Sequence, residues 1–245
     1  MQKIKKMFRK DYAGEQITTS MTWENGKWNP AKEFISNRID NQQTSKRAAV
    51  IGNGSTRANY ELYLLKNHRA GVLGSSSLQT YGCNALYRDF TPTFLISTGT
   101  EIAEEISNSL YTGDHIVYAN AEIVARYPGK FYLIPQDLHY NAGALAVYLA
   151  CFDGHEKVYM LGFDGNAGAN YNNNIYAGTN AYDPKNQDYT DTLWIKTLDV
   201  IMDTYPEVEF IRVMPNARYY CATEWASRAN FRQISWKDFT LEVDL

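Results

Sequence analysis

The sequence predicts an α/β fold: a Rossmann-like, mostly parallel sheet with helices on both faces. From residue 46 to 213, short apolar runs alternate with segments whose apolar residues recur at helical spacing, as in a parallel sheet with helical connections. The first apolar run leads into a glycine-rich turn and then a helical pattern, which is typical of the first unit of a nucleotide-binding α/β fold. With 245 residues, 44% of them apolar, the chain is long enough to bury a substantial core.

The first half of this region contains mainly strand patterns. The run RAAVI predicts a short buried strand at 47–51, and apolar residues at helical spacing predict a helix over 57–67. A weak strand is expected at 71–73. Apolar or alternating runs predict further strands at 78–83, 93–96, 115–118 and 130–134, and a helix over 101–110.

The second half begins with a segment of small residues, GALAVYLACF, which predicts a helix over 141–152 that packs closely against the sheet. The run KVYML predicts a buried strand at 157–161. A helix is expected over 189–205, and strands at 209–213 and 233–236. The segment 162–188 has no period of its own. Because it follows a buried strand at the end where open α/β sheets bind ligands, we expect it to form a lid.

Residues 1–45 differ from the rest, and we expect an irregular or short-stranded extension before a domain that spans 46–245. Five Lys and Arg residues lie within the first ten, without an acidic residue. Such a start could contact a phosphate polymer or an anionic surface, or form a solvated tail.

Composition excludes several classes of protein. A net charge of −3 and the mixture of both signs argue against a generally basic nucleic-acid coat. Three widely spaced cysteines argue against a disulfide framework and against a cysteine-based zinc site. The longest apolar runs are too short to span a bilayer, and no signal peptide is evident, so we expect a cytoplasmic protein without integral membrane contact. Homo-oligomers are compatible with the sequence.

Polar residues follow two of the predicted strands. The turn Gly52, Asn53, Gly54 and Ser55 follows the first strand, where backbone N–H groups at a helix start favour an anion. Asn84 follows the strand at 78–83. We expect Asn53 and Asn84 to converge at the carboxyl ends of adjacent strands, although each could also serve only as a turn residue.

A second group of polar residues belongs to the later part of the chain. Asn141, Ala142 and Gly143 open the small-residue helix, and His139 precedes it, where it could donate to a phosphate or act as an acid or base. Asp164 leaves the strand at 157–161, so it could bind a sugar hydroxyl, hold a metal or cap the loop. Beyond it lie Tyr171 and Tyr176, whose hydroxyls could bind a leaving phosphate.

Taken in order, these segments resemble motifs of glycosyltransferase family 42, the bacterial sialyltransferases that use CMP-activated sialic acid. The family's G-N-G-P-S loop is similar to Gly52–Ser55 without the proline, and its C-N-x-x-Y motif to Cys83–Tyr87. Its T-S-G, G-I-D-F and C-P-N motifs are similar to Asn141–Gly143, Gly162–Gly165 and Met214–Asn216. The resemblance covers roughly residues 47–216 and is patchy between the motifs.

The resemblance implies roles for single residues. Asn53, Asn84 and Asn216 match motif positions, the first two at places that contact the nucleotide. Tyr171 or Tyr176 would stand in for the tyrosines that stabilise the leaving phosphate. Ala142 replaces a serine that binds the donor, and His139 stands where the family has an arginine. The family's catalytic histidine falls in the lid, where this chain has Asp188 and Tyr189 instead.

Three functions are compatible with these observations. The first is a metal-independent glycosyltransferase that moves a sugar from a nucleotide sugar to a glycan or to a hydroxymethylated base in DNA. Asp164, His139, Asp188 or Tyr189 would act at the acceptor hydroxyl, no cofactor is expected, and the chain contains no D-x-D motif. The second is pyrophosphate or nucleotidyl transfer to a small hydroxymethyl heterocycle, which would need Mg²⁺. The third is a non-catalytic nucleotide-sugar-binding protein.

Overall fold

The computed structural model describes the core of the chain together with four strands near its start. The described residues are 4–10, 15–24, 27–30, 35–38, 45–68, 78–134, 140–164, 173–183, 191–216 and 218–245. The weak strand expected at 71–73 lies outside these residues.

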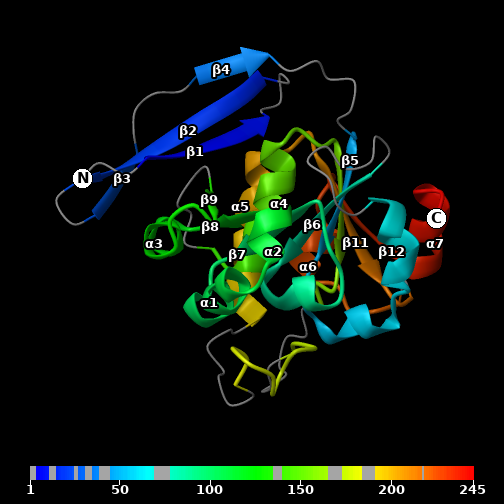
Figure 1. Cartoon of the computed structure of the whole chain (residues 1–245). Helices are drawn as coiled ribbons and strands as arrows, with labels where there is room; N and C mark the ends of the chain where they lie inside the picture. Colours follow the sequence, from blue (N-terminus) through cyan, green and yellow to red (C-terminus); the bar gives the residue numbers. More distant parts are fainter. Residues whose placement is uncertain are drawn as a thin grey trace.

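The core is one sheet of eight strands, all parallel, so the predicted fold class is confirmed (Figure 1). In chain order the strands are β5 (Arg47–Ile51), β6 (Gln79–Cys83), β7 (Phe94–Ser97), β8 (Ile116–Ala119), β9 (Tyr132–Leu133), β10 (Lys157–Leu161), β11 (Glu209–Met214) and β12 (Phe231–Ser235). Their order across the sheet is β12-β11-β10-β5-β6-β7-β8-β9. Along the chain, the sheet therefore begins with β5 at a central position and extends strand by strand to β9 at one edge. The chain then returns to add β10, β11 and β12 on the other side of β5.

Burial explains why these runs are strands. Each residue of β6 is buried, as are the last four residues of β5 and of β10. A parallel sheet is covered on both faces, so its strands are continuous apolar runs rather than alternating ones. In the parallel pair of β5 and β10, Lys157 lies opposite Arg47 and Leu161 lies opposite Ile51.

Helices cover both faces of the sheet. The small-residue helix α4 (Ala142–Phe152) lies against the central strands and beside α5 (Asp191–Thr204) (Figure 1). Nine of the eleven residues of α4 are buried, and its five alanine and glycine residues let the helix approach the sheet closely. The remaining α-helices are α1 (Thr100–Asn108), α2 (Tyr111–Asp114), α3 (Ala121–Arg126), α6 (Thr223–Ala226) and α7 (Trp236–Glu242).

The helix predicted over 57–67 is instead two 3₁₀ segments, η2 (Ser55–Asn59) and η3 (Leu62–His68). Tyr60 separates them, because its backbone is extended, with φ −105° and ψ 134°. Its hydroxyl donates to the Val213 carbonyl at 2.7 Å, and its ring stacks on Trp236 with centroids 4.9 Å apart. These tertiary contacts outweigh the local helical pattern. A third 3₁₀ segment, η4 (Asn84–Arg88), follows β6.

The segment before the core forms an antiparallel sheet. Its strands are β1 (Ile4–Lys10), β2 (Glu15–Glu24), β3 (Lys27–Pro30) and β4 (Ile35–Arg38), and each of the other three pairs with β2. The sequence pattern indicates an irregular or short-stranded extension, and β2, at 10 residues, is longer than expected.

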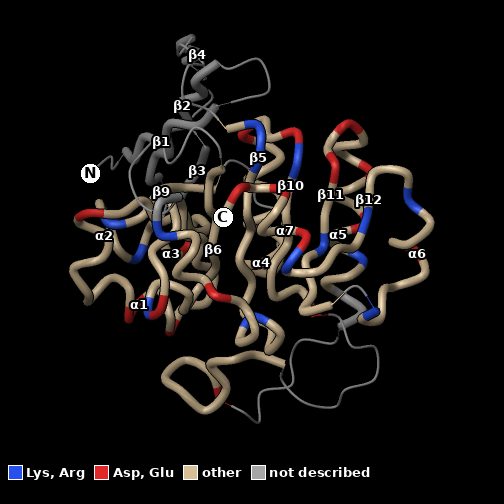
Figure 2. Tube along the Cα trace, turned by 90° about the vertical axis from the view of Figure 1, so that its right-hand side faces the viewer, with Lys and Arg blue, Asp and Glu red and all other residues tan. Residues whose placement is uncertain are grey.

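Two further observations bear on the predicted class of protein. No helix within the described ranges is long and apolar enough to cross a membrane. Figure 2 shows Lys and Arg interspersed with Asp and Glu along the described core in that view, as the nearly balanced composition predicts.

Candidate functional site

The strand order reverses between β5 and β10, which makes this pair the topological switch point of the sheet. In open α/β sheets ligands bind outside the carboxyl ends of the strands at such a point. Two loops meet there. The turn after β5 continues the pairing with β10, because Gly52 N donates to Leu161 O at 2.7 Å and Gly54 N donates to Gly162 O at 3.0 Å.

Glycine is required at this meeting of loops. A Cβ on Gly54 would lie 2.5 Å from Gly162 O and 2.6 Å from the carboxyl carbon of Asp164. Gly162 has φ +71°, and a Cβ there would lie 2.9 Å from Gly52 O. Gly54, which belongs to the turn expected to favour an anion, and Gly162 are therefore both needed for close packing of the two loops.

Asp164 fixes the first loop. Its carboxylate accepts hydrogen bonds from Thr56 N at 3.0 Å, Ser55 Oγ at 3.2 Å and Asn173 Nδ2 at 2.9 Å, and also from the Thr56 hydroxyl. Ser55 N donates to Asn173 Oδ1 at 3.2 Å. The N–H groups expected to attract an anion are thus already satisfied by acceptors of the protein. Of the three roles proposed for Asp164, this geometry is that of a loop cap, and a role as base requires that it first release some of these donors.

Asn53 and Asn84 lie together, as predicted. Asn53 Nδ2 donates to the carbonyl oxygen of Cys83, the residue that precedes Asn84, at 3.3 Å. Asn84 has φ +49° and accepts a hydrogen bond from Thr98 N at its Oδ1 atom, at 3.3 Å. Asn53 and Asn84 are partly exposed residues that directly follow or nearly follow the adjacent strands β5 and β6 at their carboxyl ends. The thiol of Cys83 itself is buried, and this burial raises its pKa to about 12 although Arg57 acts in the opposite direction, so it is no nucleophile at neutral pH.

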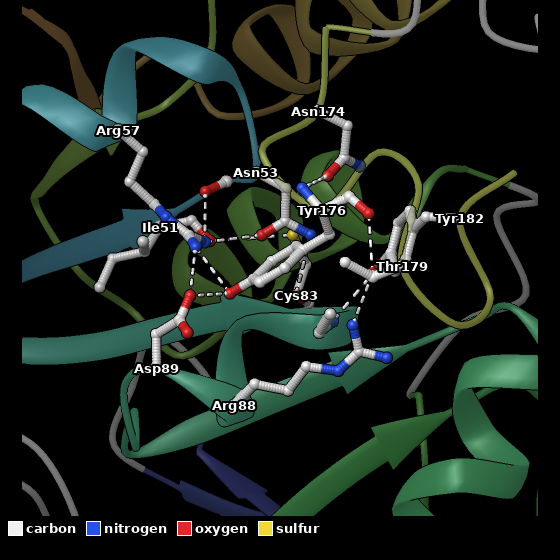
Figure 3. A network of polar contacts seen from close by, with 12 residues as sticks. Ile51, Asn53, Arg57, Cys83, Arg88, Asp89, Asn174, Tyr176, Thr179 and Tyr182 are labelled. Atoms are coloured by element: carbon white, nitrogen blue, oxygen red, sulfur yellow. Dashed lines mark hydrogen bonds and ion pairs between the residues drawn. The ribbon is translucent and has the colours of Figure 1, made fainter. Parts of the chain in front are cut away.

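A buried arginine joins this pair to a distant segment (Figure 3). The Arg57 side chain is only 2% exposed. Its Nη1 donates to Asn53 Oδ1 at 2.8 Å, and its Nη2 donates to Asp89 Oδ2 at 3.0 Å and to the Tyr176 hydroxyl at 2.6 Å. The Tyr176 hydroxyl in turn donates to Asp89 Oδ2 at 2.5 Å. Burial raises the pKa of Tyr176, which keeps its hydroxyl a neutral donor to Asp89.

Tyr176 lies in residues 173–183, one of the two described parts of the expected lid, and we call these residues the strap. Ile175 N donates to Asn53 O at 2.9 Å, so the strap backbone lies directly over the turn after β5. The Tyr176 side chain is buried, its ring 4.9 Å from the Arg57 guanidinium carbon and 5.6 Å from that of Arg88. The strap is therefore held by a buried aromatic side chain, Tyr176.

A second ion pair holds the far end of the strap. Arg88 binds Glu105 through two hydrogen bonds of 2.8 and 2.6 Å, and it also donates to Thr179 Oγ1 and Asn180 O at 2.8 and 3.0 Å. Partial burial acts to raise the pKa of Glu105, but hydrogen bonds from Arg88, Tyr87 and Asn180 lower it to about 2. Glu105 is therefore ionised throughout the neutral range.

The start of α4 lies near the same end of the sheet. Asn141 caps the helix, its Oδ1 accepting from Ala144 N at 2.8 Å, and Ala142 is buried. A Cβ on Gly143 would lie 3.5 Å from the Phe163 ring, and that ring also approaches Gly52. Phe163 thus lies between the first turn of α4 and the turn after β5. The Asn141 side chain therefore already accepts a hydrogen bond from its own helix.

Asn216 lies on the far side of β10, in an exposed turn after β11. Its Oδ1 accepts from Arg218 N at 3.0 Å. Below this turn, the buried Arg212 donates to Phe163 O and to Tyr220 O, each at 2.7 Å, and also to Asp164 O. Arg212 therefore ties the loop after β10 to the loop after β11, and Asn216 is not brought to the Asn53 and Asn84 pair by any described contact.

Four predicted site residues lie outside the described residues: His139, Tyr171, Asp188 and Tyr189. Their roles stay predictions. Sequence reasoning missed Arg57 and Asp89, and only the polar sequence after the glycine-rich turn could have drawn attention to Arg57. No local pattern marks an arginine that will be buried, because its partners come from other parts of the chain.

The described residues include no group of three or more His, Cys, Asp or Glu side chains placed to hold a metal ion. A comparison with known protein families finds no family model that matches this chain, and a search of curated proteins finds no match.

Proposed function

We propose that this protein is a glycosyltransferase that uses a nucleotide sugar without a metal ion, and that the nucleotide binds at Asn53 and Asn84. The observation that carries the proposal is that the Asn53 side chain binds the backbone of Cys83, the residue before Asn84, beside the switch point and under a strap that contains a buried tyrosine. Ligands bind at this place in other open α/β sheets. The order of motifs along the chain supports the same assignment.

In this reaction an acceptor hydroxyl attacks the anomeric carbon, the bond from that carbon to the phosphate oxygen breaks, and the nucleotide leaves with the electron pair. A base takes the proton of the acceptor. His139, Asp188 and Tyr189 are the candidates for this role, and Asp164 would first have to give up hydrogen bonds with Thr56 and Asn173.

Hydrogen-bond donors would stabilise the leaving phosphate. Arg57 and the Tyr176 hydroxyl lie next to Asn53, but both are bound to Asp89 in this structure. A phosphate could therefore replace the Asp89 carboxylate as the acceptor for Tyr176. The acceptor molecule would be a glycan or a hydroxymethylated base.

The test measures binding and turnover separately. Wild-type protein would be titrated with CMP, UMP, GMP and AMP by calorimetry, with Mg²⁺ and with EDTA, and then incubated with CMP-N-acetylneuraminic acid, UDP-glucose, UDP-galactose and GDP-mannose while nucleotide release is followed. We expect one nucleotide to bind in EDTA and the corresponding nucleotide sugar to be consumed. Asn84→Ala should weaken binding roughly tenfold through the loss of one hydrogen bond.

Asn230→Ala is the matched control, because Asn230 Nδ2 donates to Met202 O at 3.1 Å just before β12, at the opposite end of the strands. Binding that requires Mg²⁺ would favour pyrophosphate or nucleotidyl transfer. Binding without any consumption of nucleotide sugar would identify a binding protein, and no binding at all would refute the assignment of the site.

A further inference from the structure

The orientation of the Asn53 carboxamide is set by its two neighbours. An arginine can only donate and a backbone carbonyl can only accept. The amide atom 2.8 Å from Arg57 Nη1 must therefore be the oxygen, and the atom 3.3 Å from Cys83 O must be the nitrogen. The opposite orientation would place two donors against each other and two acceptors against each other. One N–H of Asn53 remains that no hydrogen bond within the described residues uses.

Arg57 is held firmly enough to impose this orientation. Besides Asn53, its guanidinium binds Gly52 O at 3.3 Å, and it binds Asp89 and Tyr176 as described. These partners come from three separate parts of the chain, and the side chain is 2% exposed. A planar guanidinium bound on several sides has little freedom to turn, so the atom that it presents to Asn53 is always an N–H.

The orientation of the Asn84 carboxamide is also fixed, by a separate contact. Its Oδ1 accepts from Thr98 N, a backbone group that can only donate. Each asparagine oxygen therefore accepts one hydrogen bond from the protein, which fixes the side of each side chain that carries the N–H groups.

We propose that Arg57 is a positioning residue that holds Asn53 as a hydrogen-bond donor, so that the ends of β5 and β6 select a ligand group that only accepts. Such a group is a phosphoryl oxygen or a carbonyl oxygen of a pyrimidine base. This inference rests on the proposed function, since it names the part of the nucleotide that the two asparagines recognise. A ligand that presents a donor at this place binds less well, because each asparagine oxygen already accepts a hydrogen bond from the protein while the Asn53 N–H is left for an acceptor.

The Asn53→Asp variant separates positioning from a structural role. A carboxylate can still accept from Arg57 Nη1, and this hydrogen bond becomes charge-assisted, but the hydrogen bond to Cys83 O is lost because the second carboxylate oxygen cannot donate. The same carboxylate turns lone pairs toward the ligand and repels an acceptor oxygen. The Asn53→Ala variant loses both contacts but repels nothing. Thermal stability should therefore be highest for the wild type, lower for Asn53→Asp, which keeps only the Arg57 contact, and lowest for Asn53→Ala. Nucleotide affinity should instead fall in the order wild type, Asn53→Ala, Asn53→Asp.

The probes are CMP, UMP, GMP and AMP, the four corresponding nucleosides, and inorganic phosphate and pyrophosphate, each titrated by calorimetry. For the nucleotide that binds best, we expect a loss of roughly tenfold for Asn53→Ala and roughly 30-fold or more for Asn53→Asp. If phosphate or pyrophosphate alone reproduces this ranking, the acceptor is a phosphoryl oxygen. If the nucleoside reproduces it, the acceptor is the base carbonyl.

A double-mutant cycle tests whether Arg57 acts through Asn53. Arg57→Lys should weaken binding in the wild-type background and have little further effect in the Asn53→Ala background. If a nucleotide binds to the wild type and equally well to Asn53→Asp, the inference is wrong while the proposed function stands. If no probe binds to the wild type, the proposed function and the inference fail together. If Arg57→Lys does not fold, the comparison of the two Asn53 variants decides the matter alone.

Discussion

Removal of one oxygen atom, in Tyr176→Phe, should release the strap from the sheet without changing the apolar packing beneath it. The ring of Tyr176 would stay between the two guanidinium groups and 5.8 Å from the Tyr182 ring. Only the hydroxyl is lost, with its 2.6 Å contact from Arg57 and its 2.5 Å contact to Asp89. The substitution therefore isolates the polar part of the attachment.

The expected cost follows from the burial of the two partners. Hydrogen bonds to charged groups contribute about 1.5–3 kcal/mol each. The Asp89 side chain is 50% exposed, so water can replace the hydroxyl there, whereas Arg57 is 2% exposed and keeps Asp89 as a partner. One such contact is then effectively lost, which lowers the free energy of unfolding by about 2 kcal/mol. For a chain of this size that corresponds to a decrease in Tm of roughly 4–8 °C.

Thermal and urea unfolding would measure this change, and limited proteolysis would report whether cleavage begins within 173–183. Tyr63→Phe is the control, because Tyr63 is 64% exposed and its hydroxyl hydrogen-bonds Glu61 at 3.5 Å. The control should change stability by less than about 0.5 kcal/mol. Equal Tm values for the two variants, with unchanged cleavage, would show that the Arg57 and Asp89 contacts do not hold the strap.

Three further predictions concern the surroundings of this site. Because the pKa of Glu105 is lowered to about 2 in the folded chain from 4.5, its pairing with Arg88 stabilises the fold above about pH 4.5 and is lost as the pH falls toward 2. This ion pair contributes at most roughly 3 kcal/mol to the free energy of unfolding. The loss of stability between pH 4.5 and 2, followed by circular dichroism, should therefore be smaller for Glu105→Gln than for the wild type. Gly54→Ala should destabilise the fold by about 2 kcal/mol or more because its Cβ has no room, whereas Gly113→Ala, which meets nothing within 4 Å, should be tolerated in the same urea titration. Asp164→Ala should lower stability by roughly 2–4 kcal/mol by leaving Thr56 N and its hydroxyl without their acceptor, and a wild-type Tm would show that the carboxylate is free for chemistry.

The sequence predicts the core elements well where local pattern and burial agree. The strands at 47–51 and 157–161 coincide with β5 and β10, and the small-residue segment coincides with α4 to within one residue at its start. Elements whose length depends on their neighbours are predicted less well. The strand expected at 130–134 is reduced to Tyr132–Leu133 at the edge of the sheet, and the helix at 57–67 is divided at Tyr60 by contacts with Val213 and Trp236.

The candidate site, too, could be predicted only in part from the sequence. Asn53 and Asn84 could be placed together from sequence, because the carboxyl ends of adjacent parallel strands share one edge. The role of Asp164 could not, since its partner Thr56 lies 108 residues away, and the same carboxylate could equally have faced a ligand.

The sequence by itself determined the α/β class, most strands and the glycines that permit a close turn after β5, because each depends on short-range apolar patterns and backbone conformation. Only the tertiary structure decided that the chain returns from β9 to the other side of β5, and that Arg57 is enclosed by Asn53, Asp89 and Tyr176. The burial of a charged side chain is favourable only when its partners are all in place. Those partners are spread over more than a hundred residues, so no local pattern encodes the network that orients the site.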